Sequence, residues 1–114
     1  MTADEFRKMA LGFAGAVESA HMNHPDFRVG GKIFATLGYP ADDLGMVKLT
    51  PEQQQSFVQA NPEAFFPAKG AWGVRGATQV RLSMVKTGAL CKALTAAWVN
   101  VNQKRAEQRS GRRK

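Results

Sequence analysis

The chain has 114 residues, of which 44% are hydrophobic and 22% are charged, and it contains seven Phe and two Trp. This length and composition are typical of one globular domain, and they exclude two independent domains and a disordered chain. The single cysteine, Cys91, excludes an internal disulfide, and the acidic N-terminus lacks the pattern of a signal peptide. Because no apolar run approaches the ~18 residues of a membrane helix, we expect a soluble, cytoplasmic protein without membrane contacts.

The net charge of +7 is concentrated at the C-terminus. Residues 104–114 carry six Lys and Arg against Glu107 alone, a net charge of +5, whereas the other 103 residues carry ten basic and eight acidic side chains, a net charge of +2. The sequence therefore predicts a folded domain over residues 1–103 and a basic, flexible tail over residues 104–114. Such a tail fits both phosphate binding and a purely solubilising role.

Helical periodicity opens the chain. Thr2 and Glu5 have the spacing of a reciprocal capping pair, and apolar residues then recur on one helical face at Phe6, Met9, Ala10, Phe13 and Val17. The pattern predicts a helix over residues 3–18. Gly12 and Gly15 weaken it, which indicates either fraying or a close approach of another element.

Three strands are predicted next, within residues 20–29, at residues 32–37 and at residues 46–49. Pro25 favours an edge or bent strand for the first of them. Gly30 and Gly31 predict a two-residue turn with positive φ that joins the first two strands. Alternation along the second strand places Ile33, Ala35 and Leu37 on one face, and Lys32, Phe34 and Thr36 on the other.

Thr50, Pro51 and Gln53 predict a helix that ends near residue 60, followed by an extended stretch at residues 65–67. A second hairpin is expected around Gly76, with strands at residues 72–75 and 78–82. Its second strand is expected to turn Val80 and Leu82 toward the core and Gln79 and Arg81 outward. A final helix begins near residue 86 and ends near residue 110, with one apolar stripe formed by Leu90, Leu94, Ala97, Trp98 and Val101.

The order of these elements defines the fold class. It is α+β, a single domain of the form α-β(3)-α-β(2)-α, with an antiparallel sheet and helices packed mainly on one face.

No catalytic or metal-binding constellation is evident. Ile33 follows Lys32 where a phosphate loop needs Ser or Thr, and the loop's first glycine is missing. His21, His24 and Asp26 are of metal-ligand type, but residues three apart on a strand lie on opposite faces. Cys91 is interpreted as a small buried hydrophobe and Asp42-Asp43 as part of a solvated loop. We therefore expect no enzyme activity, metal or cofactor.

Basic side chains on strands and turns provide candidate phosphate contacts. Two glycine-turned hairpins with such residues fit wings that touch a nucleic-acid backbone, but the residues by themselves favour the solvated sides of amphipathic strands. The candidates are Arg28, Lys32, Lys48, Lys69, Arg75 and Arg81, together with Lys104, Arg105, Arg109, Arg112, Arg113 and Lys114 of the tail.

Three segments in this order, HPDFRVGGKIFATL, MVKLTPEQQ and FFPAKGAWGVRG, resemble the MmcQ/YjbR family over most of residues 3–101. The matching positions are Phe27, Val29, Gly31, Lys32, Phe34, Ala35, Lys48, Pro67 and Trp72. The resemblance implies a fold like that of type III secretion chaperones, a double-wing DNA-binding role for the two hairpins, and neither enzymatic activity nor a cofactor. The segment at residues 78–83 and the basic tail depart from the family pattern.

Three functions stay open. The first is a non-enzymatic protein that binds DNA without sequence preference and in a salt-sensitive way, as a monomer or weak dimer. The second is a domain that holds a protein or peptide partner on a sheet face or edge. The third is a small-ligand pocket lined by Phe34, Trp72 and Trp98.

Overall fold

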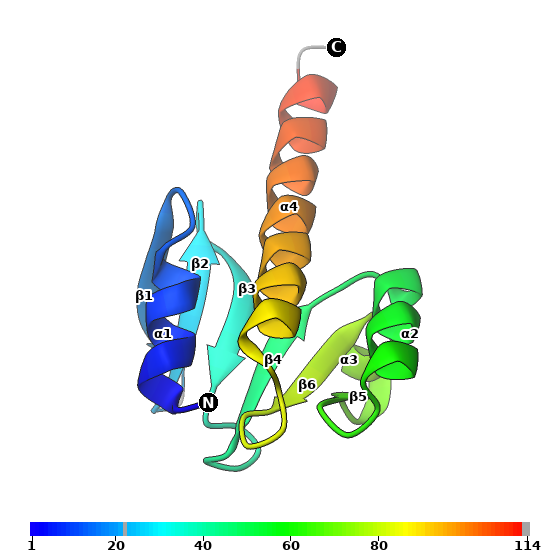
Figure 1. The fold of residues 1–114 in the computed structure, drawn as a ribbon. Helices are drawn as coiled ribbons and strands as arrows, with labels where there is room; N and C mark the ends of the chain where they lie inside the picture. The colour runs from blue at the N-terminus through cyan, green and yellow to red at the C-terminus, as the bar shows by residue number, and fades with distance from the viewer. Residues whose placement is uncertain (22, 113–114) are drawn as a thin grey trace.

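The computed structural model describes residues 1–21 and 23–112, and for His21 and residues 104–112 it describes the backbone alone. Ten elements follow one another along the chain (Figure 1). They are α1 (Ala3–Leu11), β1 (Ala16–His21), β2 (His24–Val29), β3 (Lys32–Leu37), β4 (Leu44–Lys48), α2 (Pro51–Ala60), β5 (Phe65–Pro67), α3 (Gly70–Val74), β6 (Ala77–Arg81) and α4 (Thr87–Arg112).

All six strands form one sheet in the order β1-β2-β3-β4-β6-β5, and every neighbouring pair is antiparallel. Helices α1, α4 and α2 lie along one face of this sheet, with α4 across its middle (Figure 1). The core fills the space between these two layers, and its largest fully buried side chains include Phe6, Phe27, Phe34, Phe65, Leu90 and Leu94. The predicted α+β class is therefore confirmed.

The first helix is shorter than its periodicity predicts, and the sheet has one strand more. Helix α1 ends at Leu11, Gly12 caps it, and Gly15 at φ +75° turns the chain into β1. The predicted helix over residues 3–18 is thus wrong beyond Leu11. Six residue pairs join β1 to β2, and these tertiary contacts outweigh a helical spacing that places Val17 in line with Phe13.

A β-bulge turns Phe34 toward the core, against the predicted alternation. Opposite Phe27 and Arg28 of β2 stand Ala35 and Ile33 of β3, so Phe34 is an extra residue in the ladder. Phe34 and Ala35 are both fully buried as a result. The Gly30-Gly31 turn has positive φ at both residues, as predicted. Strand β2 is not an edge strand, and Pro25 is tolerated because it pairs with β1 alone.

The predicted second hairpin is wrong, because residues 70–74 form the short helix α3 instead of a strand. Gly76, at φ +114°, follows this helix and leads directly into β6. β6 pairs with β4 and with the short strand β5. Val80 and Leu82 are buried in the core as expected, but Gln79 is also buried because Met46 and Phe66 flank it.

Helix α4 runs to Arg112, slightly beyond the predicted end near residues 110–111. Its predicted stripe is buried at Leu90, Leu94, Ala97 and Val101. The interpretation of Cys91 as a buried hydrophobe is wrong, because Cys91 is exposed. Each helical residue is rotated by ~100° from the one before it, so Cys91 lies beside the buried stripe rather than in it.

A reciprocal capping box fixes the start of α2. The Thr50 hydroxyl accepts a hydrogen bond from the Gln53 N–H at 3.2 Å, and the Gln53 side chain accepts one from the Thr50 N–H at 3.0 Å. We expect Thr50→Ala to lower the free energy of unfolding by about 1 kcal/mol, because the helix N-terminus then loses its side-chain acceptor. Urea denaturation monitored by circular dichroism measures this loss, and an unchanged midpoint would contradict it.

Candidate functional site

Four basic residues lie at one end of the sheet. Lys32 is the first residue of β3 and Lys48 the last of β4, and antiparallel pairing brings these two ends together. Lys48 pairs with Ala77, the first residue of β6, which follows directly on α3. Lys69 and Arg75 flank α3 at its two ends, and both are exposed. We call Lys32, Lys48, Lys69 and Arg75 the basic end of the sheet.

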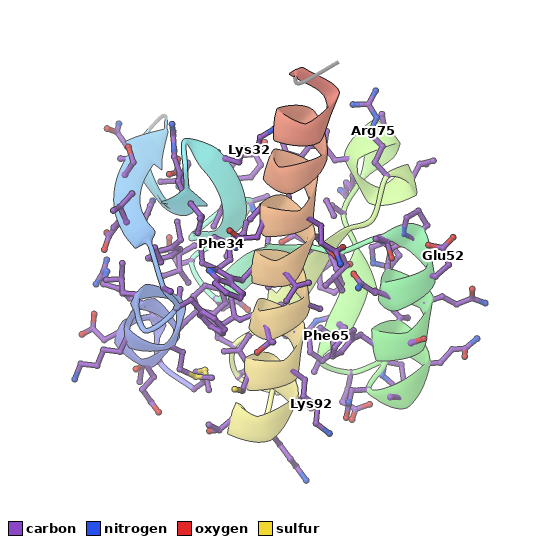
Figure 2. All side chains as sticks on the ribbon, turned by 90° about the horizontal axis from the view of Figure 1, so that it is seen from above. Lys32, Phe34, Glu52, Phe65, Arg75 and Lys92 are labelled. Atoms are coloured by element: carbon purple, nitrogen blue, oxygen red, sulfur yellow. The ribbon has the colours of Figure 1, made fainter. Side chains whose placement is uncertain are left out.

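The C-terminal half of α4 passes this end of the sheet. The Asn100 side-chain amide donates hydrogen bonds to the Lys48 carbonyl at 3.2 Å and to the Gln53 side chain at 2.8 Å, which ties α4 to the end of β4. The helix backbone continues for twelve residues to Arg112, or about 18 Å. Figure 2 shows Lys32 and Arg75 on either side of this part of α4.

The helical extension carries most of the tail's charge. The helical backbone includes Lys104, Arg105, Arg109 and Arg112. Arg113 and Lys114 lie outside the described residues. The described backbone of residues 104–112 thus extends from the end of the molecule that holds the four cations of the sheet end.

The distribution of acidic residues along the sequence indicates this clustering, although the net charge of the whole chain does not. No Asp or Glu occurs between Glu63 and Glu107, a stretch that holds seven Lys and Arg, whereas residues 1–63 hold eight acidic and five basic residues. The loop acids Asp42 and Asp43 and the nearby Glu63 lie at the opposite end of the sheet, next to the start of β4 and of β5. Glu52, in the first turn of α2, is the carboxylate that follows Lys48 most closely along the chain.

Two of the expected phosphate-binding residues are engaged elsewhere. Arg28 forms a two-pronged ion pair with Asp26, with Nε–Oδ1 at 2.8 Å and Nη2–Oδ2 at 3.0 Å. Asp26 is only 1% exposed, and its hydrogen bonds raise the pKa of the Arg28 guanidinium. The pair satisfies a buried carboxylate, so Arg28 has a structural role.

Arg81 lies at the other end of β6, opposite Leu44. Its guanidinium stacks over the Phe66 ring at 4.3 Å and donates to the Glu63 carbonyl at 3.4 Å. The structure therefore places Arg81 away from the basic end of the sheet. Arg28 pairs with Ile33, next to Lys32, and so lies near that end, but its guanidinium is held by Asp26.

The three residues expected to line a ligand pocket divide between two places. Phe34 and Trp98 both pack against Phe13, with ring centroids 6.2 and 5.9 Å from its ring, and the Trp98 indole donates to the Ala14 carbonyl at 2.9 Å. Trp72 is 59% exposed on α3, where the Lys48 ammonium lies 5.4 Å from its ring centroid. Trp72 thus lies beside the basic end of the sheet.

Residues 68–77 are held by close backbone contacts. The Gln54 side-chain amide donates to the carbonyls of Gly73 at 3.0 Å and Ala77 at 2.9 Å, which bracket the end of α3. A Cβ on Gly73 would overlap the Ala68 carbonyl, and one on Gly76 would overlap the Leu49 carbonyl. Both positions therefore require glycine, and α3 is fixed against α2 and the end of β4.

Among the side chains that the structure describes, those considered for catalysis or metal binding form no cluster. Within the described side chains, no three His, Cys, Asp or Glu residues lie together as metal ligands would. The His24 ring packs edge-on against Tyr39 at 5.2 Å, and the His21 side chain lies outside the described part of the structure. Cys91 borders a shallow depression with Met9, Gly12 and Phe13.

A second, open depression lies between α2 and the start of α4. Phe57, Ala60 and Ala89 contribute to its mainly apolar lining, together with Lys86 and Lys92. It lies away from the basic end of the sheet, because α4 begins at the opposite end. Within residues 1–21 and 23–112, no helix has both the length and the apolar character needed to cross a bilayer.

The fold belongs to the α+β class: it is a single domain with a six-stranded antiparallel sheet and helices α1, α4 and α2 on one face (Figure 1). The YjbR family model matches residues 11–100, and the chain belongs to the YjbR family. The crystal structure of the Deinococcus radiodurans protein DR2400, with a DUF419 domain, has the same fold: the TM-score is 0.76 at 21% sequence identity, over 90% of this chain and 80% of that chain. No curated protein matches the chain.

Proposed function

We propose that the protein is a non-enzymatic DNA-binding protein that contacts phosphates through the basic end of the sheet and the basic C-terminal part of α4. The observation that supports this function is the placement of four cations from three separate segments at the end of the sheet that α4 passes. Phosphate contacts are formed by Lys and Arg without base recognition, so binding is independent of sequence.

This contact surface differs from a pair of wings. The Gly30-Gly31 hairpin contributes Lys32, but the second contribution comes from α3 and the residues that flank it. No groove-reading helix is required, because the extended helix α4 supplies charge rather than base contacts.

The depression between α2 and α4 favours a second candidate, a protein-interaction role. Its apolar lining with Lys86 and Lys92 suits an acidic peptide that inserts an apolar side chain. Such an interaction would bury apolar area, and with two lysines it would weaken with salt less steeply than phosphate contacts formed by many cations.

Two matched double variants test the proposed DNA site. Lys69→Gln with Arg75→Gln removes two charges from the basic end, and Arg81→Gln with Lys86→Gln removes two charges from the opposite end. We expect the first variant to weaken binding of a labelled duplex by roughly tenfold or more at about 50 mM salt, measured by fluorescence anisotropy. The second variant is expected to change affinity by less than about threefold.

Equal losses in the two variants would show that net charge alone drives binding and would overturn the proposed site. Absence of binding by the unaltered chain at low salt would overturn the proposed function. In that case, the second candidate is tested by titrating the chain with an acidic peptide. Phe57→Ala should weaken that binding, because Phe57 lines the depression.

A further inference from the structure

Trp72 is a large apolar side chain that the fold leaves in water. It is 59% exposed, and Val74, two residues further along α3, is 78% exposed. The other tryptophan, Trp98, is half-buried against Phe13 and hydrogen-bonded to the Ala14 carbonyl. Trp72 therefore contributes little to the core, and its indole is accessible to a ligand.

The backbone that carries Trp72 is rigid. Gln54 anchors the carbonyls of Gly73 and Ala77, and Gly73 and Gly76 allow backbone contacts that a Cβ would prevent. An exposed ring on a fixed backbone loses little conformational entropy when a flat partner stacks on it.

Positively charged residues lie beside the ring and at both ends of its helix. Lys48 lies 5.4 Å from the ring centroid, and Lys69 and Arg75 flank the same short helix on either side. A flat aromatic face among cations matches a chain of alternating bases and phosphates, and a base can stack only where it is not paired within a duplex.

We propose that Trp72 is a stacking platform for an unpaired base, and that Lys48, Lys69 and Arg75 hold the adjacent phosphates of a single-stranded nucleic acid. This inference rests on the proposed function and adds to it a preference for single strands over duplexes. The ligand chemistry is shared by DNA and RNA.

The test titrates the full chain with a thymidine oligonucleotide of about 12 nucleotides, a uridine oligonucleotide of the same length, and a DNA duplex of the same length. We expect the single strands to bind more tightly than the duplex and to quench tryptophan fluorescence. In Trp72→Phe, where Trp98 is the remaining fluorophore, the quenching should disappear while the ring preserves much of the affinity. In Trp72→Ala, single-strand affinity should fall roughly tenfold or more, with duplex affinity nearly unchanged.

Tyr39→Ala is the matched control. Tyr39 is 60% exposed and lies in the loop at the opposite end of the sheet, so its removal should leave single-strand binding unchanged. Comparable losses in Trp72→Ala and Tyr39→Ala would overturn the platform.

Two failures are distinguishable. Equal affinity for single strands and duplex, without quenching, would overturn the stacking platform and leave phosphate binding standing. Absence of binding to all three probes would overturn the proposed function itself. Quenching and tighter single-strand binding in either the thymidine or the uridine arm supports the platform.

Discussion

Replacing Gly76 by alanine is expected to destabilise the protein by about 2–6 kcal/mol. Gly76 has φ +114°, a conformation that side chains rarely adopt, and a Cβ there would overlap the Leu49 carbonyl. Backbone strain and overpacking each cost about 1–3 kcal/mol. For a domain of this size, the melting temperature should fall by at least about 8 °C, which calorimetry measures directly.

Two other glycines serve as controls for this substitution. Gly88→Ala, in the first turn of α4, places a Cβ in open space and should stabilise the helix by up to about 1 kcal/mol. Gly31→Ala also meets no neighbour, but at φ +81° it should cost about 1–2 kcal/mol from strain alone. A Gly76→Ala protein no less stable than Gly31→Ala would contradict the close contact between residue 76 and the end of β4.

Salt is expected to have the largest effect on DNA binding. If six to ten of the basic residues of the sheet end and the tail contact phosphates, the affinity of the full chain for a duplex should fall by ~10³ to 10⁵ between 50 and 200 mM salt. The cause is the release of counterions from each neutralised phosphate. Anisotropy titrations at several salt concentrations give the slope.

A tail-neutralised variant separates the contributions of the tail and the sheet. Glutamine at the six basic positions of residues 104–114 leaves Lys32, Lys48, Lys69 and Arg75, and four phosphate contacts predict a fall of only about a hundredfold over the same salt range. An unchanged slope would show that the tail makes no phosphate contacts. A slope near zero in this variant would remove the basic end of the sheet from the interface.

Local patterns predicted the elements whose physics is local. The capping boxes at Thr2 and Thr50 and the Gly30-Gly31 turn form as predicted because each depends on a few neighbouring residues. The apolar stripe of α4 was also readable, since one helix face must cover the core.

Non-local pairing decided the elements that the patterns missed. Val17 fits the helical spacing by its position but a strand by its β-branched side chain, and the ladder between β1 and β2 decides for the strand. Trp72 suits a strand by its β propensity, but the contacts of Gln54, Gly73 and Gly76 place it on a helix. Phe34 faces the core only because a bulge shifts the register.

The candidate site shows the same division. The sequence by itself determined the α+β class, the family, and the list of cations available for phosphate contacts. The tertiary structure alone decided which of them lie near one another, because strand order brings Lys32, Lys48 and α3 to one end and directs α4 past it. The tertiary structure also pairs Arg28 with the buried carboxylate of Asp26. Leaving Asp26 charged and unpaired inside the fold would cost more free energy than the loss of one phosphate contact.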